Sequence, residues 1–152
     1  MSAKPRTIVV GVGNLLRRDD GAGIHVVQLL KENAPWIDTN EAGLACMEIL
    51  EAIKGYDCAV IVDAIQSGGA PGTVYNVDLT RGEKPPAIGS SHGVDLLTTL
   101  RLGEQLYAGE LPADIRLIAV EAEDIMTLSE SCTPAVEEAV KRVSDHIIRL
   151  LR

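Results

Sequence analysis

Three long apolar runs constrain how this chain can fold. They are TIVVGV at residues 7–12, CAVIVDA at residues 58–64 and IRLIAVEA at residues 115–122. Runs that are apolar at nearly every position are typical of parallel strands that are buried on both faces. Segments with helical spacing of apolar residues lie between them, and this alternation predicts βα units.

The rest of the chain predicts two more strands and four helices. Residues 37–42 predict a short strand, and TVYNVDL at residues 73–79 alternates as a half-buried strand does. The short connection before TVYNVDL favours an antiparallel pairing with the preceding strand. The predicted helices cover residues 20–33, 46–54, 92–106 and 134–151.

Local signals mark two of the helix ends. Gly55 is expected to cap the second helix, and Thr133-Pro134 is expected to open the last one with an N-cap and a proline in the first turn. The predicted fold class is therefore α/β, a three-layer sandwich with a mostly parallel sheet of about five strands, one of them antiparallel, and helices on both faces. With 152 residues and 46% hydrophobic content, we expect one domain over residues 1–152.

Composition excludes several classes of protein. The formal net charge is −8 and the acidic residues are spread along the chain, so a nucleic-acid partner or an anionic membrane surface is not expected. No apolar run is long enough to span a bilayer or to form a signal peptide, which predicts a cytosolic protein without membrane insertion. Cys46, Cys58 and Cys132 are too widely spaced to indicate a disulfide framework or a zinc-thiolate site.

The stretch GVGNLLRRDDGAG at residues 11–23 resembles a phosphate-binding loop but departs from it in two ways. Leu16 stands where the third glycine of G-x-G-x-x-G would pack a helix against the sheet. Asp19 and Asp20 would also repel a phosphate at the helix N-terminus. Dinucleotide binding is therefore disfavoured.

A divalent cation fits the polar residues of this region better. Asp20 follows the first strand, Asp63 ends the central strand and His92 precedes the third helix, so all three are expected at the carboxyl ends of the parallel strands. Oxygen and nitrogen donors without thiolate suit zinc, nickel, cobalt or manganese. The alternative roles are a helix cap for Asp20, a loop acceptor for Asp63 and a solvated side chain for His92.

Four motifs in fixed order then indicate a family. They are G-x-G-N-x-L-x-x-D-D-G-x-G at residues 11–23, I-V-D-A at 61–64, P-G-T-V at 71–74 and S-S-H-G at 90–93. Together with IAVEAED and the LS…TPAV helix opening, they resemble the hydrogenase maturation endopeptidases, which process nickel-iron hydrogenases. The second loop, at residues 40–44, departs from that family's Asp-Gly-Gly-Thr-like turn.

The resemblance implies an activity, a partner and a metal. Members cut a C-terminal extension from the precursor of the hydrogenase large subunit once nickel has been inserted. The implied metal-ligand and catalytic positions fall on Asp20, Asp63 and His92. The nickel would be supplied by the substrate and serve as its recognition element, and zinc or another divalent cation could occupy the site in the isolated protein. We expect a monomer that meets the precursor transiently.

The chain offers no convincing nucleophile of its own. No G-x-S-x-G elbow surrounds Ser90 or Ser91. Cys58 is expected in the core, and neither Cys46 nor Cys132 has a histidine near it in sequence. His25 and His146 are expected on helix surfaces or in packing. The hypothesis is therefore attack by water, assisted by the metal or by a carboxylate as in an aspartyl-type endopeptidase.

Neighbouring residues are assigned supporting roles, and three alternatives stay open. Asp19 is expected to cap a helix or to orient Asp20, Asn14 to brace the loop, and Gly21 and Gly23 to let the backbone turn closely. Further acidic candidates near strand ends are Glu41 and Glu121. The alternatives are an enzyme with its own permanent zinc, a nonenzymatic nickel chaperone, and a small-molecule-binding α/β domain.

Overall fold

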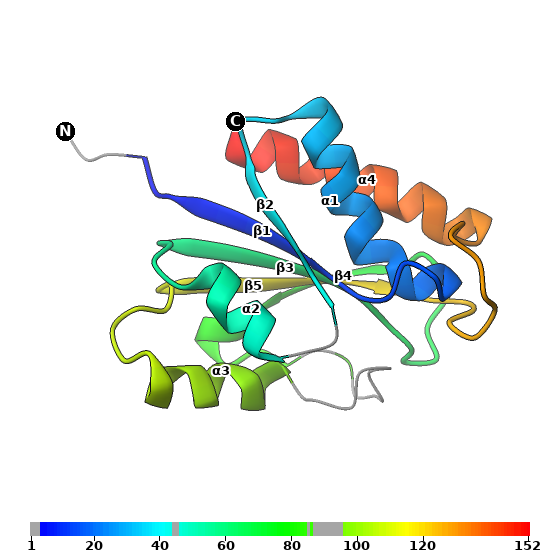
Figure 1. Ribbon diagram of the computed structural model, residues 1–152. Coiled ribbons are helices and arrows are strands. Elements are labelled where there is room, and N and C mark those ends of the chain that lie inside the picture. Colours follow the sequence, from blue (N-terminus) through cyan, green and yellow to red (C-terminus); the bar gives the residue numbers. More distant parts are fainter. Residues whose placement is uncertain (1–3, 44–45, 85, 87–95) are drawn as a thin grey trace.

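A five-stranded sheet forms the centre of the molecule (Figure 1). The computed structural model describes residues 4–43, 46–84, 86 and 96–152. The strands are β1 (Thr7–Val12), β2 (Asp38–Ala42), β3 (Cys58–Ile65), β4 (Val74–Asp78) and β5 (Asp114–Glu121). Their order is β2-β1-β3-β5-β4, with four parallel strands and β4 antiparallel to β5. The predicted mixed sheet with one antiparallel strand is confirmed. The expected partner of that strand is wrong, because β5 lies between β3 and β4 and pairs with both.

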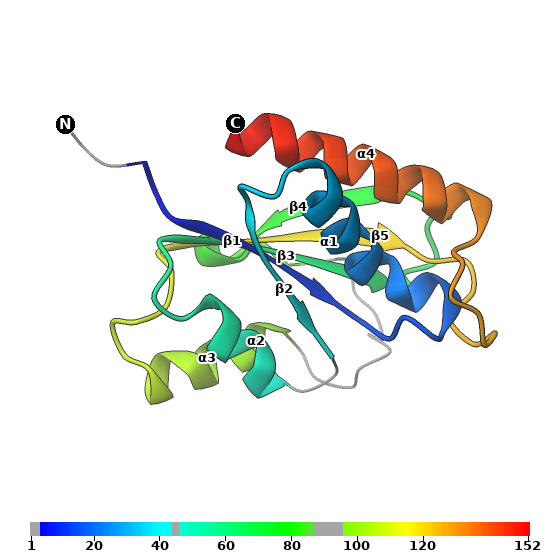
Figure 2. The ribbon, with the colours of Figure 1, turned by 45° about the horizontal axis from the view of Figure 1, so that its top comes forward.

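Helices cover both faces of this sheet and complete the three predicted layers. They are α1 (Ala22–Asn33), α2 (Cys46–Ile53), α3 (Leu96–Leu106) and α4 (Pro134–Leu151). As Figure 2 shows, α1 and α4 lie on one face and α2 and α3 on the other. Two short 3-10 helices, η1 (Arg18–Gly21) and η2 (Leu79–Arg81), follow β1 and β4. Within the described ranges, no helix combines the length and apolar character needed to cross a membrane.

The central strands fill both layers of the core because successive side chains point to opposite faces. In β1, Val9 packs in the cluster beneath α1 and α4, whereas Ile8 and Val10 belong to the cluster beneath α2 and α3. In β3, Val62 and Ile61 divide in the same way. This double burial explains why these strands are apolar at almost every position.

The two helix ends with local sequence signals lie where predicted, but one of them lacks the expected capping hydrogen bond. Gly55 has a φ of +87°, as a glycine that ends a helix often does, and its N–H donates to the carbonyl of Glu110. Thr133 occupies the N-cap position of α4 and Pro134 begins the helix, as predicted. However, the Thr133 side chain makes no capping hydrogen bond, because its hydroxyl donates to Asp19 instead.

Two other helix starts differ from, or lie beyond, the prediction. The helix expected from residue 20 begins at Ala22, since residues 18–21 form η1. The helix expected from residue 92 is described from Leu96, and its predicted start lies outside the described residues.

Direct backbone contact brings the first turn of α1 onto the sheet. A Cβ atom at Gly23 would lie 2.2 Å from the carbonyl oxygen of Val62 in β3. A Cβ atom at Gly11 would lie 2.2 Å from the carbonyl oxygen of Gly23. Real Cβ atoms do not approach oxygen so closely, so glycine at both positions permits this packing. The segment between these glycines is thereby held across the ends of β1 and β3.

We predict that Gly23→Ala lowers the free energy of unfolding by about 3 kcal/mol, because the new methyl group forces α1 away from β3. Chemical denaturation with equilibrium detection measures the change. Gly43→Ala is the matched control: its nearest neighbour would be the flexible Glu48 carboxylate at 3.4 Å, and we expect a change below about 1 kcal/mol. Equal stability of the two variants would contradict the packing argument.

Candidate active site

Asp20 lies in η1, just beyond the carboxyl end of β1. Gly13, with a φ of +144°, lets the chain turn there, since a Cβ atom on it would lie 2.0 Å from the Asp20 carbonyl oxygen. The Asp20 side chain is completely buried, and its Oδ2 accepts a hydrogen bond of 3.1 Å from the backbone N–H of Asn14. The close turn of the loop therefore fixes one carboxylate oxygen of Asp20.

Asp63 lies in the neighbouring strand at the same edge of the sheet. It follows Val62, which pairs with Gly11 of β1, and η1 packs against β3. The strand continues two residues further than Asp63, to Ile65, so Asp63 does not end it as expected. The Asp63 side chain is half-buried, and its Oδ1 accepts a hydrogen bond of 2.8 Å from the N–H of Ala64. The structure thus places both predicted carboxylates at the carboxyl edge of β1 and β3.

His92, the third predicted ligand, lies outside the described residues. In the ranges that the structure describes, no group of three His, Cys, Asp or Glu side chains has the arrangement of a metal site. The described part of the candidate site is therefore a pair of carboxylates, one buried and one half-buried.

Asp19 connects three segments that are far apart in sequence. Its Oδ2 accepts hydrogen bonds from the N–H groups of Glu123 at 2.9 Å and Asp124 at 3.0 Å, and from the Thr133 hydroxyl at 2.7 Å. Its Oδ1 accepts one of 2.7 Å from the N–H of Thr133. In the described part of the chain, the Asp19 side chain therefore caps no helix and makes no hydrogen bond to Asp20; it connects η1 to the start of α4.

The loop after β1 also pairs directly with the loop before α4. Asn14 Oδ1 accepts a hydrogen bond of 3.0 Å from the N–H of Leu16, which confirms that its amide braces the loop. Beside it, Arg17 and Ser129 form an isolated parallel bridge. The paired loops leave three large apolar side chains exposed near η1: Leu16, Met126 and Leu128. Hydrophobic periodicity does not predict this pairing, because neither loop has a regular apolar pattern.

The two additional acidic candidates have different surroundings. Glu41 is exposed, and its Oε1 lies 3.5 Å from Lys31 Nζ. Glu121, at the end of β5, is only 1% exposed. It accepts hydrogen bonds from the Ser67 N–H at 2.7 Å, the Ser67 hydroxyl, and the Tyr75 hydroxyl at 3.0 Å. Burial opposes its ionisation, but these bonds outweigh that effect and lower the pKa of Glu121. Glu121 thus holds the turn between β3 and β4.

The described cysteines lack the properties of a catalytic nucleophile. Burial, with the carboxylates of Asp19 and Glu137 nearby, raises the pKa of the Cys132 thiol to about 12. Cys58 is half-buried, so it is not the core residue expected, and it begins β3 five residues before Asp63. At roughly 3.3 Å per residue, about 16 Å of strand separates the two. Neither described cysteine is therefore a suitable nucleophile for the candidate site.

The described histidines on helices also have roles outside catalysis. The His25 ring in α1 is hydrogen-bonded, through Nε2, to the carbonyl oxygen of Glu130 at 2.8 Å. His146 is exposed on α4. Both lie on helices as expected, one in packing and one on the surface.

We predict that Asp19→Asn destabilises the protein by about 3 kcal/mol. The amide would present N–H groups to buried donors that now share a carboxylate, which leaves some of them unsatisfied. Chemical denaturation measures the loss. The control is Asp145→Asn, an exposed change on α4 that should cost less than about 0.5 kcal/mol. A loss no larger than that of the control would show that the Asp19 contacts do not hold the loops.

We also predict that Cys132 reacts slowly with iodoacetamide at pH 8 in the folded protein. Its raised pKa keeps it as the unreactive thiol, so alkylation should be at least about a hundredfold slower than for the unfolded chain. Mass spectrometry of the labelled peptides measures the rate at each cysteine. Labelling at Cys132 as fast as in denaturant would contradict the prediction.

Comparison with known proteins identifies the family. A hydrogenase maturation protease family model, HycI, matches residues 24–150. The chain is 30% identical to the Hydrogenase 2 maturation protease of Escherichia coli, over 97% of this chain and 91% of that protein. It is also 30% identical to the hydrogenase expression/formation protein HoxM of Azotobacter vinelandii, over 80% of this chain and 60% of that longer protein.

Solved structures agree with the sequence matches. The hydrogenase maturating endopeptidase HybD of E. coli superposes with a TM-score of 0.79 and 27% identity, covering 97% of this chain and 92% of that one. The [NiFe] hydrogenase maturation protease HybD of Thermococcus kodakarensis also gives 0.79, with 25% identity, covering 97% of this chain and 99% of that one. This chain, with two carboxylates at the carboxyl edge of its sheet, is a peptidase that belongs to the hydrogenase maturation protease family.

Proposed function

We propose that the chain is an endopeptidase that removes the C-terminal extension from the nickel-loaded precursor of a nickel-iron hydrogenase large subunit. The nickel of the substrate is its recognition element. The observation that carries this proposal is the position of Asp20 and Asp63 at one edge of the sheet in a member of this family. The proposed enzyme is a cytosolic monomer that meets its precursor transiently.

The residues at this edge suit a divalent cation. Two carboxylates provide oxygen donors, and the N–H of Asn14 holds Asp20 Oδ2 in place. We propose His92 as a nitrogen donor completing the set, with zinc or another divalent cation occupying the site when no precursor is bound. A cation held there would polarise a peptide carbonyl and lower the pKa of water.

The two carboxylates are proposed to have different roles, because their surroundings differ. Asp20 is buried and fixed by the loop, so it positions the substrate's nickel. Asp63 is half-buried, and its carboxylate is the proposed acceptor for the proton of the attacking water. The peptide nitrogen that leaves takes up a proton, which completes hydrolysis. Membership in a protease family favours this function over the nickel-chaperone alternative.

The test is incubation of the purified protein with a cognate precursor, with and without inserted nickel, followed by intact mass of the precursor. We expect loss of a C-terminal peptide from the nickel-loaded form only. Asp20→Asn, Asp63→Asn and His92→Ala should each slow cleavage by at least about a hundredfold, because each removes a donor or the proton acceptor. Asp114→Asn is the matched control. Asp114 begins β5, at the end of the strands opposite to the candidate site, and the variant should cleave the precursor normally.

Each other result has a definite meaning. Cleavage of both precursor forms would support the peptidase activity and would rule out nickel as the recognition element. An unchanged mass with a changed nickel content would instead indicate the chaperone. Normal cleavage by Asp63→Asn would remove Asp63 from the mechanism.

A further inference from the structure

Strand β4 forms one edge of the sheet, so one side of its backbone faces away from β5. The N–H of Asp78 donates to Glu83 Oε1 at 2.9 Å, and the carbonyl of Asp78 accepts from the N–H of Glu83 at 3.2 Å. Both backbone groups of Asp78 therefore point away from β5. The N–H and C=O groups of successive residues in an antiparallel strand point to opposite sides. Those of Asn76 and Val74 therefore also point away from β5. Thr73 lies an odd number of residues from Asp78, so its carbonyl should face β5. It does, because it accepts a hydrogen bond from the N–H of Glu121.

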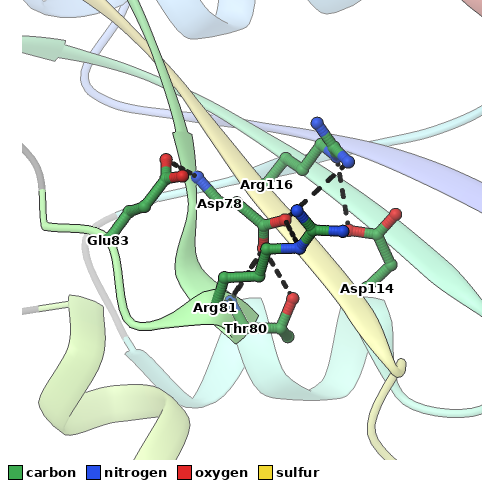
Figure 3. A network of polar contacts seen from close by, with 6 residues as sticks. All are labelled: Asp78, Thr80, Arg81, Glu83, Asp114 and Arg116. Atoms are coloured by element: carbon green, nitrogen blue, oxygen red, sulfur yellow. Dashed lines mark hydrogen bonds and ion pairs between the residues drawn. The ribbon is translucent and has the colours of Figure 1, made fainter.

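The open part of the edge is short and well defined. At Asp78 the edge is closed by Glu83, within the polar network shown in Figure 3. At Val74 and Asn76, the outward N–H and C=O groups have no hydrogen-bond partner among the residues that the structure describes. Both residues are exposed. These two residues can therefore pair with one short extended segment, which is how many proteins add a peptide to a sheet.

A basic groove lies beside this open edge. It has a volume of about 370 Å³ and is floored by Val74, Asn76 and Ile118. The α4 wall presents Arg142, His146 and Arg149. Their spacing of four and three residues puts them on one face of the helix.

The charge of this groove differs from that of the chain as a whole. Two arginines line it against one carboxylate, that of Asp145, in a chain with a net charge of −8. The groove thus concentrates positive charge on an otherwise acidic protein, and it suits an acidic ligand.

We propose that β4 and this groove form a docking site for an extended acidic segment of the precursor, which pairs with β4 as an added strand. Side chains alternate along a strand, so every second residue of the segment faces the groove and meets Arg142, His146 and Arg149. The identity of the partner rests on the function proposed above.

The position of this docking site suits a peptide substrate. Asp63 pairs with Ala119 of β5, and Ala119 pairs with Tyr75 of β4. The added strand would lie one spacing beyond β4, so three strand spacings of about 4.8 Å, or about 14 Å, separate it from the backbone of Asp63. A few further residues of extended chain span this distance. A second copy of the protein fits less well, because pairing two β4 edges would bring the arginines of both grooves together.

The charge contribution is tested with Arg149→Glu in the precursor cleavage assay. Arg149 is exposed near the end of α4, and the reversal should raise KM about tenfold, equivalent to 1.4 kcal/mol of binding, with kcat within about twofold. Lys141→Glu is the matched control. It makes the same charge change on the same helix outside the groove, and KM should stay as in the wild type.

The edge contribution is tested with Asn76→Pro. Proline removes the outward N–H while an edge strand tolerates it, so KM should again rise about tenfold. Circular dichroism checks that the variant is folded, and Asn76→Asp keeps the backbone intact while placing a carboxylate in the groove to repel the segment. Both Asn76 variants should leave kcat nearly unchanged.

The possible results separate this inference from the proposed function. If the wild type cleaves the precursor and the Arg149 and Asn76 variants have its KM, the docking site is wrong and the endopeptidase stands. If the wild type cleaves nothing, amide hydrogen exchange with the full-length precursor still decides: slower exchange at Val74 and Asn76 supports docking, and unchanged exchange overturns it. A dimer that Asn76→Pro dissociates would assign the edge to self-association and overturn the inference.

Discussion

The arrangement of the candidate site depends on the hydrogen bonds that the buried carboxylate of Asp19 accepts. This carboxylate joins the 3-10 turn after β1, the loop after β5 and Thr133, the N-cap residue of α4, through four hydrogen bonds. Its neighbour Asp20 is part of the same short turn, so the position of Asp20 relative to β3 follows from contacts made by Asp19. The two adjacent aspartates thus differ in role, since Asp19 fixes the loop and Asp20 is the proposed metal ligand.

Much of the fold follows from short-range signals. The runs at β1, β3 and β5 are apolar because both faces of each strand are covered, and that pattern is visible without any knowledge of the partner strands. The antiparallel direction of β4 follows from its short connection to β3, since a crossover helix does not fit, but its partner β5 comes later in the chain and could not be read from that connection. Placement of Asp20 and Asp63 at one edge follows in turn from parallel strands that end side by side.

Long-range polar contacts could not be predicted in the same way. The residues bonded to Asp19 are more than 100 positions away, and Thr133 carries a local capping signal whose hydroxyl is used elsewhere. Glu121 is a similar case. Its position near a strand end suggests a site residue, whereas three hydrogen bonds from Ser67 and Tyr75 make it part of the turn that leads into β4. A carboxylate near a strand end has no local feature that distinguishes these roles.

The closure of the β4 edge at Asp78 also bears on solubility. An edge strand with a long row of unpaired backbone groups can recruit further chains and start the growth of an intermolecular sheet. Here Glu83 occupies the groups of Asp78, so among the described residues of β4 the open stretch is limited to residues 74–76, beside a charged groove. Such a stretch is too short to sustain the stacking of identical segments on which fibrils depend. The protein can therefore keep one strand edge accessible without acquiring the tendency to aggregate that such edges usually bring.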